Sequence, residues 1–341
     1  MKTAPRRAWW PAACAVVLGL LGPAAQAGPS TQAKQSPEVA AHARDVAAWL
    51  ERLHLAASRS TYTGTFVVSS GPDISASRIW HVCDDRQQVE RIERLTGSPR
   101  ITWRRNDEVV TLSPEDRVAT WERRDGLGRF PNFPEQPGRQ IGDFYEARVV
   151  GRERVAGLDA DVVEFQPRDP LRFGHRIWSA RASGLALRWQ TRAVSGEVLE
   201  QASFTDLLLN APLSTERLAR QMAVPAGYQT VRPTLTRISP QAQGWRIREG
   251  VPGFLPTNCQ MGGGGTTNEP APLQCILSDG LASVSLFIEP YDPARHAREG
   301  QAVRGATHSI SRRLNDSWVT AVGEVPTETL KRLSLSLEPA R

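Results

Sequence analysis

Residues 278–290 carry the sequence SDGLASVSLFIEP, a turn followed by a strand that ends at a proline. Asp279 and Gly280 are typical turn residues, and the side chains after them alternate between polar and apolar. Further along, residues 320–326 (TAVGEVP) indicate a second strand, after which Pro326 suits the start of a helix. These two stretches predict a small α+β unit in the C-terminal part of the chain.

The N-terminal residues predict an exported protein. Lys2, Arg6 and Arg7 precede a short apolar run, Ala12–Leu21, and Ala25-Gln26-Ala27 has the small residues of a cleavage site. We expect a signal peptide that is cleaved after Ala27. An uncleaved N-terminal anchor is the alternative, although the run is short for a membrane span, which needs about 20 apolar residues.

Length and charge set broad limits on the rest. The sequence has 341 residues, which suits two domains better than one, and a formal net charge of +6 at pH 7. The modest basic surplus fits an acidic peptide or a phosphate-bearing lipid as partner, and equally fits ordinary solvation. No later segment is apolar for about 18 residues, so we expect the mature chain to be soluble.

The first predicted domain is mostly β. A helix that opens at Pro37 comes first, with an apolar stripe formed by Val39, Ala43, Val46, Leu50, Leu53 and Ala57. Roughly ten or eleven short strands follow between Thr61 and Leu207 with turn residues between them, which indicates an antiparallel meander. Asp125–Gly138 has no periodicity and is predicted to be a long irregular loop. A highly curved sheet with a helix on its concave side fits this inventory, and the concavity offers room for an apolar ligand.

The second predicted domain follows a linker. Ser214 caps a short helix that extends to Met222, and Val224–Gln243 then has many Pro, Gly, Ser and Thr residues with little apolar pattern. The last helix, from Pro326, is expected to bury Leu330, Leu333 and Leu337. The predicted boundaries are 1–27 for the signal peptide, 37–222 for the large domain, 223–243 for the linker and 244–341 for the small domain.

Three cysteines lie beyond the predicted cleavage site. Export implies an oxidising compartment, where a pair of cysteines can close. Cys259 and Cys275 flank a stretch that contains the run Gly262–Gly265, so we predict a disulfide between them, worth about 3 kcal/mol in the chain-entropy model. Cys83 is then either a buried small side chain in a strand or a free thiol.

Patterns of catalytic chemistry are missing from the sequence. The six histidines form neither HExxH nor a Cys/His zinc spacing, and no G-x-S-x-G or P-loop is present. Trp and Arg alternate instead on several predicted strands, such as Trp80 beside Arg78 and Trp178 beside Arg176 and Arg181. Such pairs favour packing on a sheet face or recognition of an amphipathic partner, and nucleic acid is an implausible ligand for an exported protein.

Segments along nearly the whole mature chain resemble the RseB/MucB family of periplasmic regulators of the envelope-stress sigma factor. The resemblance lies in residues 62–67 (YTGTFV), 78–92, 105–109 (RNDEV), 151–157 (GRERVAG), 167–174 (PRDPLRFG), 184–187 (GLAL), 278–290 and 320–326. Two places depart from the family pattern. Residues 250–254 read GVPGF where a Leu-Pro-Pro-Gly-Phe-like segment is usual, and the stretch between the two cysteines looks like an insertion.

The resemblance implies a binding protein without catalytic residues, metal or cofactor. It implies an N-terminal half-open β-barrel like that of the lipoprotein carriers, with helices in its concavity, and a smaller C-terminal α+β domain. The implied partner is the periplasmic part of a membrane-spanning anti-sigma factor (RseA/MucA-like), which the small domain and the interdomain cleft contact and shield from proteolysis. Lipid or lipopolysaccharide in the large domain is the implied signal, and a homodimer is compatible with the family.

We name candidate residues for both sites. The candidates for the lipid cavity are Phe66, Val68, Trp80, Trp103 and Trp178. The candidates for partner binding are Arg172, Phe173, Arg176, Phe287 and Glu289. Two other functions stay open on the sequence: a periplasmic carrier of lipid or lipoprotein, and an exported hydrolase, which no motif supports.

Overall fold

The structure is a computed structural model that describes residues 45–84, 87–123, 141–263, 272–296 and 298–340. All of them belong to one unit of the chain, which spans residues 37–341. The predicted signal peptide, the helix start at Pro37 and the loop Asp125–Gly138 lie outside the described residues. Within the described part of the chain, none of the helices combines the length and the apolar character needed to cross a membrane.

The first half of the chain builds a 12-stranded sheet, which we call the large sheet. Its helices are α2 (Val46–Arg59), α3 (Ile141–Phe144) and α4 (Thr215–Arg220). Its strands are β1 (Tyr62–Ser70), β2 (Asp73–Cys83), β3 (Gln88–Arg94), β4 (Ile101–Arg105), β5 (Glu108–Ser113), β6 (Val118–Arg123), β7 (Tyr145–Val155), β8 (Leu158–Pro167), β9 (Gly174–Ala180), β10 (Ala186–Arg192), β11 (Val198–Leu209) and β12 (Gln229–Val231).

The strand order of the large sheet is β12-β6-β5-β4-β3-β2-β1-β11-β10-β9-β8-β7. Consecutive strands pair with one another from β1 to β6 and from β7 to β11, and β11 also pairs with β1 and so joins the two runs. Every described pair in this sheet is antiparallel apart from β12 with β6. The sheet is open, because β12 and β7 lie at its two ends without pairing to each other.

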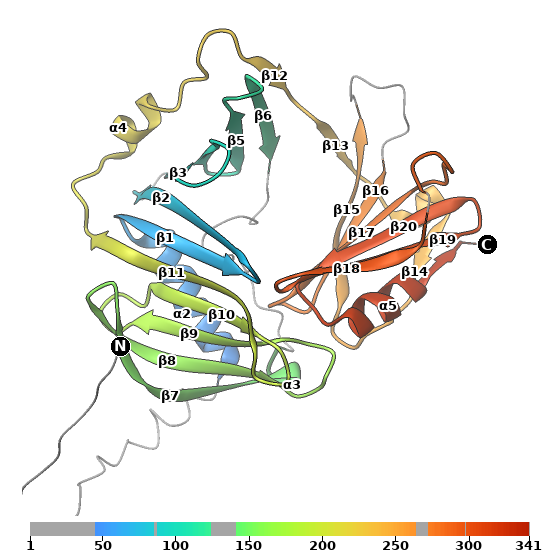
Figure 1. The fold of residues 1–341 in the computed structure, drawn as a ribbon, viewed down its shortest axis with the longest axis horizontal. Coiled ribbons are helices and arrows are strands. Elements are labelled where there is room, and N and C mark those ends of the chain that lie inside the picture. Colours follow the sequence, from blue (N-terminus) through green and yellow to red (C-terminus); the bar gives the residue numbers. More distant parts are fainter. Residues whose placement is uncertain (1–44, 85–86, 124–140, 264–271, 297, 341) are drawn as a thin grey trace, which may run out of the picture. The chain divides into compact units, whose positions relative to one another are not determined.

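Helix α2 covers one face of the large sheet, which we call the inner face (Figure 1). Asp45 caps the helix, since its carboxylate accepts hydrogen bonds from the backbone N–H groups of Ala47 and Ala48. The described part of the predicted stripe is confirmed, because the side chains buried by the helix include Val46, Leu50, Leu53 and Ala57. Burial of this stripe against the sheet is the main force that holds α2 in place.

The opposite face of the large sheet, the outer face, is covered by α4 and the residues after it. The hydroxyl of Ser214 accepts a hydrogen bond from the N–H of Arg217, which confirms Ser214 as the cap of α4. Leu218 of α4 packs against Val82 and Val89. A second outer cluster is formed by Trp103, Val110, Leu112 and Ala119, on which Met222, Val224 and Tyr228 pack.

The second half of the chain builds a seven-stranded sheet, the small sheet, in the order β13-β15-β16-β17-β20-β19-β18. Its strands are β13 (Thr234–Arg237), β15 (Leu255–Gly263), β16 (Leu273–Ser278), β17 (Ser283–Pro290), β18 (Gly300–Arg304), β19 (Thr307–Leu314) and β20 (Ser317–Gly323). A two-stranded sheet joins β14 (Trp245–Ile247) to β21 (Leu337–Pro339), and the helices are η1 (Pro240–Gln243) and α5 (Thr327–Leu335).

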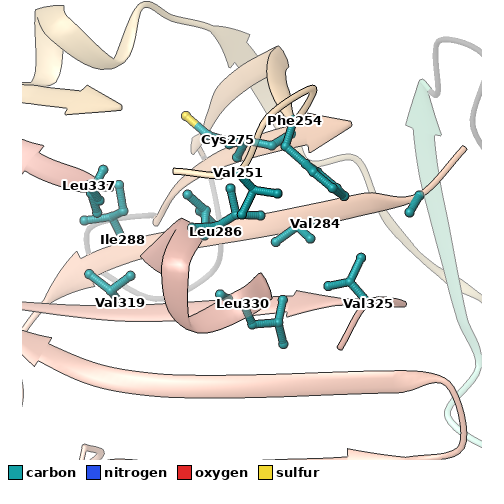
Figure 2. Packing of buried hydrophobic residues seen from close by; sticks show 14 of the residues in the cluster. Val251, Phe254, Cys275, Val284, Leu286, Ile288, Val319, Val325, Leu330 and Leu337 are labelled. Atoms are coloured by element: carbon teal, nitrogen blue, oxygen red, sulfur yellow. The ribbon is translucent and has the colours of Figure 1, made fainter. Parts of the chain in front are cut away.

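Helix α5 packs against one face of the small sheet, and the core lies between them (Figure 2). Val284, Leu286 and Ile288 of β17 are buried in this core, as the alternation of residues 278–290 predicts. Leu330 and Leu333 of α5 meet them. Leu337 is also buried, but the prediction that it belongs to the helix is wrong, because α5 ends at Leu335 and Leu337 pairs with Ile247 between β21 and β14.

The fold class is therefore confirmed as α+β, with a large open antiparallel sheet, a helix on one of its faces, and a smaller α+β part. The segment predicted to be a linker contains more regular structure than expected. Its residues form β12 on the large sheet, β13 on the small sheet and the short helix η1. These short strands are held by backbone pairing rather than by buried apolar side chains, so their sequences contain little pattern from which a strand could be predicted.

Candidate functional site

A buried ionic cluster lies where the loop between β8 and β9 meets the small sheet, and we call it the junction. Its centre is Arg172, whose side chain is completely inaccessible to solvent. The guanidinium donates from Nε to Oδ2 of Asp279 over 2.7 Å, and from its other two nitrogens to the Asp169 carboxylate and the Pro252 carbonyl oxygen. A buried guanidinium is stable only when its donors are matched in this way.

The turn between β16 and β17 orients the Asp279 carboxylate. Its Oδ1 atom accepts hydrogen bonds from the backbone N–H groups of Leu281 and Ala282, at 3.0 and 2.8 Å. Its Oδ2 atom accepts from Arg172 and from the hydroxyl of Tyr145, the latter at 3.2 Å. The turn residues of the sequence SDGLA thus place a fully bonded carboxylate inside the protein.

Aromatic rings enclose the Arg172 guanidinium. Its central carbon lies 4.2 Å from the centroid of the Phe144 ring and 5.2 Å from that of Phe254. Such cation–π contacts gain strength when water is excluded. Burial raises the pKa of the Tyr145 hydroxyl well above its ordinary value, and the Asp279 carboxylate raises it further, so this hydroxyl remains a hydrogen-bond donor.

Further contacts surround the junction. The Thr329 hydroxyl of α5 donates to the carbonyl oxygen of Leu171 over 2.6 Å, and the Leu171 side chain belongs to the core under the small sheet. Phe173 meets His308 of β19 edge-on, with ring centroids 5.4 Å apart. Residues 169–173 are thus held by the turn between β16 and β17, by α5 and by β19 through contacts far apart in sequence.

The chemistry of the junction is that of a structural and binding element. The arginine is paired with two aspartates, and the hydrogen-bonding groups of this ion pair are already satisfied within the protein. The described residues contain no group of three or more His, Cys, Asp or Glu side chains that could hold a metal ion.

Two family models match the chain and together cover most of it. The model of the MucB/RseB N-terminal domain matches residues 45–222, and the model of the MucB/RseB C-terminal domain matches residues 239–338. The chain belongs to the MucB/RseB family. The junction thus joins residues of the first matched region to residues of the second.

Known MucB/RseB proteins align along most of their length. The sigma factor AlgU regulatory protein MucB of Pseudomonas aeruginosa is 32% identical over 308 residues, which cover 88% of this chain and 93% of that protein. The sigma-E factor regulatory protein RseB of Escherichia coli K12 is 23% identical over 300 residues, covering 85% and 90%. A solved complex of P. aeruginosa MucA and MucB matches with a TM-score of 0.67 and 29% identity, over 86% of this chain and 98% of that one.

The predicted partner-binding residues of this MucB/RseB protein lie in three places. Arg172 and Phe173 belong to the junction and are buried, so they hold the protein together rather than face solvent. Arg176 lies on the outer face of β9 and pairs with Glu164. Phe287 and Glu289 lie together on the face of the small sheet opposite the core, where both are half-buried, and Glu289 contacts His296 over 3.1 Å.

The predicted lipid-cavity residues do not come together. Phe66 and Val68 point to the inner face, where Phe66 meets Phe204 and the α2 side of the core. The cross-strand register places Trp80, Trp103 and Trp178 on the outer face. Trp80, for example, pairs with Thr63, whose side chain lies on the face of β1 opposite to that of Phe66. The groove beside α2, lined by Ala48, Glu51, Arg52, Leu55, Ala56, Arg59, Ser60 and Ser183, contains none of the five.

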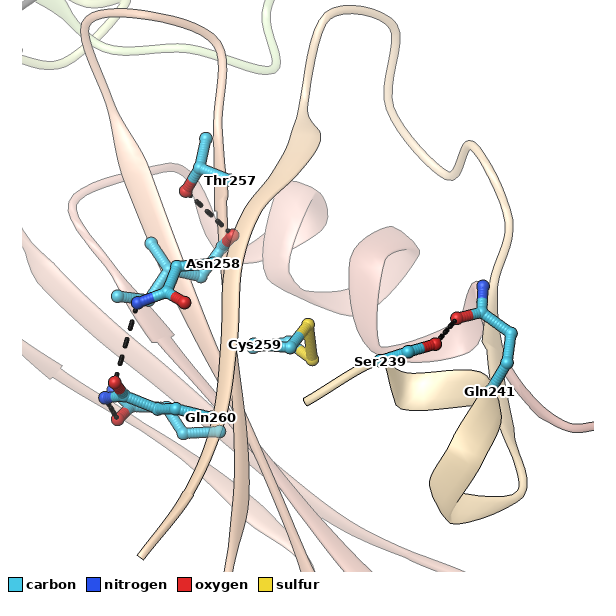
Figure 3. Close-up of a disulfide and its surroundings, with 9 residues drawn as sticks. Ser239, Gln241, Thr257, Asn258, Cys259 and Gln260 are labelled. Atoms are coloured by element: carbon cyan, nitrogen blue, oxygen red, sulfur yellow. Dashed lines mark hydrogen bonds between the residues drawn. A yellow bond between two sulfur atoms is a disulfide. The ribbon is translucent and has the colours of Figure 1, made fainter. Parts of the chain in front are cut away.

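The predicted disulfide between Cys259 and Cys275 is confirmed (Figure 3). The two residues are direct cross-strand partners in β15 and β16, so strand pairing rather than a flexible loop brings them together. On the neighbouring positions of the same strands the side chains of Asn258, Gln260 and Gln274 form a hydrogen-bonded row on the opposite face. Cys83 is half-buried and outside the disulfide.

Sequence reasoning missed two residues of interest. Asp279 was assigned to a turn, and nothing in its neighbourhood indicates that it pairs with Arg172, because their separation in sequence is 107 residues. His175 is buried on the inner face between Tyr145 and Trp189, and neither ring nitrogen has a hydrogen-bond partner among the described residues. Burial lowers the pKa of the His175 imidazole to about 3, which keeps it neutral.

Proposed function

We propose that this chain is a periplasmic regulator that binds the periplasmic domain of an anti-sigma factor and shields it from proteolysis. The observation that carries the proposal is the match over most of both chains to MucB, a sigma factor regulatory protein that has been solved in complex with MucA(peri). A binding role, without turnover of a substrate, agrees with the regulatory names of the relatives.

The open face of the small sheet is our candidate for the partner surface. Its side chains alternate with those of the core along β16, β17 and β20, and they include Gln274, Ile276, Ser285, Phe287, Glu289 and Thr320. Phe287 lies between its register partners Gln274 and Thr320, so one aromatic ring sits in a polar surrounding. An aromatic anchor ringed by polar groups is typical of the centre of a protein interface.

Arg172 acts on the partner indirectly in this proposal. Its side chain is fully buried and cannot touch another protein without rearrangement. The junction instead sets the positions of the turn at Asp279 and of β17, which follows directly. Loss of Arg172 is therefore expected to weaken folding and partner binding together, whereas loss of Phe287 affects binding alone.

Binding of the purified chain, residues 28–341, to the periplasmic domain of the anti-sigma factor from the same organism tests the function. We expect Phe287→Ala to weaken binding about tenfold or more, which is the usual effect of removing an interface hot spot. Leu208→Ala is a control, because this exposed residue of β11 lies on the other sheet. Absence of binding by the unmodified chain, or binding that leaves the anti-sigma factor equally open to its protease, would overturn the proposal.

A further inference from the structure

The segment between the two sheets carries a strand at each end and almost no slack. Strand β12 ends at Val231 on the large sheet, and β13 begins at Thr234 on the small sheet. Only Arg232 and Pro233 separate them, and the proline ring restricts its own backbone. An extended chain gains at most about 3.6 Å per residue, so the ends of the two strands stay within about 11 Å of each other.

Strand β12 is weakly held. It pairs with β6 over only three residues, Gln229 with Val118, Thr230 with Ala119 and Val231 with Thr120. This pairing is parallel, and parallel ladders are slightly less stable per residue than antiparallel ones. The side chains of Gln229 and Thr230 are exposed, so little apolar burial supports the strand.

Strand β13 is held more firmly. It pairs antiparallel with β15 over four residues, from Thr234 with Gly263 to Arg237 with Gln260. The next residue, Ile238, extends the attachment, since its N–H donates to the carbonyl oxygen of Cys259 over 3.0 Å and its side chain packs on the buried core. The disulfide ties β15 to β16 beside this attachment. A pull on the segment therefore detaches β12 before β13.

The surface beside β12 contains buried donors without acceptors. The indole Nε1 atoms of Trp103 and Trp121 and the Nε atom of Arg91 are inaccessible and have no hydrogen-bond partner among the described residues. The register places all three on the outer face, across β3, β4 and β6. Of the three, Trp121 belongs to β6, the strand that pairs with β12, and exposure of its indole N–H to water would satisfy this donor.

The residue after β12 covers one of these rings. The guanidinium carbon of Arg232 lies 4.4 Å from the centroid of the Trp121 ring, and Arg232 is itself exposed to solvent. Upstream, Met222, Val224 and Tyr228 pack on the outer cluster by apolar contacts that do not depend on β12. Release of β12 alone would therefore lift Arg232 from Trp121 and free the edge of β6.

We propose that residues 229–232 form the releasable end of a strap, so that any displacement of the small sheet away from the large one peels β12 from β6. The lack of slack at Arg232-Pro233 transmits the displacement, and the short parallel ladder is the part that yields. The consequence is a new edge on β6, next to an uncovered Trp121, that is exposed only when the sheets have moved.

Hydrogen–deuterium exchange of the full chain tests the attachment of the strap. Gln229→Pro removes the backbone N–H that donates to the carbonyl oxygen of Arg117 over 2.8 Å at the start of β12. We expect exchange in β6 and β12 to rise about tenfold or more while β2 and β3 keep their protection. Gln229→Ala keeps this backbone N–H, is the matched control and is expected to leave exchange unchanged, since the Gln229 side chain is exposed. Equal protection of β6 in the proline and alanine variants would overturn the proposal.

A second experiment tests whether displacement of the small sheet is transmitted to β12 through Arg232-Pro233. Asp279→Asn weakens the junction between the sheets, and we expect it to speed exchange in β12 and β6 of the native-length chain. The same substitution in a chain with six Gly and Ser residues inserted between Arg232 and Pro233 should leave β12 protected. A rise of equal size in both chains, or in neither, would show that the strap is not taut and would refute the inference.

Discussion

Arg172 and Asp279 form an ion pair whose side chains are both completely buried, with Nε and Oδ2 2.7 Å apart. The arginine comes from the loop after β8 and the aspartate from the turn before β17, so one contact ties the large sheet to the small sheet. Because such a pair is stable only while both charges are present, the junction is where a single substitution should have the largest effect.

Asp279→Ala should reduce the free energy of unfolding by about 3–5 kcal/mol, because it leaves the Arg172 charge buried with only Asp169 opposite. Urea denaturation followed by tryptophan fluorescence measures the change. Glu328→Ala is the control, since its pair with Arg332 is half-exposed on α5 and should matter by less than about 1 kcal/mol. Similar costs for the two variants would contradict a central role of the junction.

Gly253→Ala should destabilise the protein by about 1–3 kcal/mol through strain and overcrowding. Gly253 has a φ of +85°, and a Cβ atom there would lie 2.3 Å from the Phe144 ring, which packs on Arg172. Gly300→Ala is the matched control, because no atom of the described residues lies within 4 Å of a Cβ atom at that position. The melting temperatures of the two variants give the comparison, and an equal or smaller loss at Gly253 would speak against close packing there.

Acid should destabilise the fold through His175. Burial lowers the pKa of this imidazole from 6.5 to about 3, so between these pH values the unfolded chain binds a proton that the folded chain does not. Stability is therefore present above about pH 6.5 and falls as the pH drops, by about 2 kcal/mol at pH 5. Urea titrations at pH 7.5 and pH 5 measure the loss.

His175→Phe is the informative variant for this titration. It removes the ionisable group while keeping a ring between Tyr145 and Trp189, and it also removes two nitrogens that have no hydrogen-bond partner within the ranges that the structure describes. We expect the variant to lose less stability between pH 7.5 and pH 5 than the unmodified chain does. An unchanged pH dependence would show that His175 titrates normally in the folded state.

Removal of the disulfide, as Cys259→Ala with Cys275→Ala, should cost about 3 kcal/mol by the entropy of the closed loop. Their separation of 16 residues sets this value, and the pairing of β15 with β16 should persist because neighbouring ladder bonds remain. Calorimetry gives the melting temperature of the variant. A melting temperature equal to that of the unmodified chain would mean that the bridge adds nothing beyond the strand pairing.

Local patterns predicted most elements of the large sheet correctly. Hydrophobic alternation and turn residues predicted roughly ten or eleven strands between Thr61 and Leu207, where the structure has β1 to β11, and the periodic stripe located α2. The same rules missed β12 and β13, since strands of three and four residues with exposed side chains have no apolar pattern to detect. Likewise Leu337 continued the periodicity of α5, although the chain leaves the helix before it.

The candidate site was predictable only in part. The sequence itself determined the family segments, the turn that carries Asp279 and the cysteines of the disulfide, because each depends on residues close together in the chain. Tertiary structure alone decided that Arg172 is buried against Asp279 and that Phe66 and Trp80 face opposite sides of one sheet. It also decided that the His175 ring nitrogens find no hydrogen-bond partner in the described part of the chain. Those outcomes depend on cross-strand register and on contacts between distant segments, which local sequence patterns do not specify.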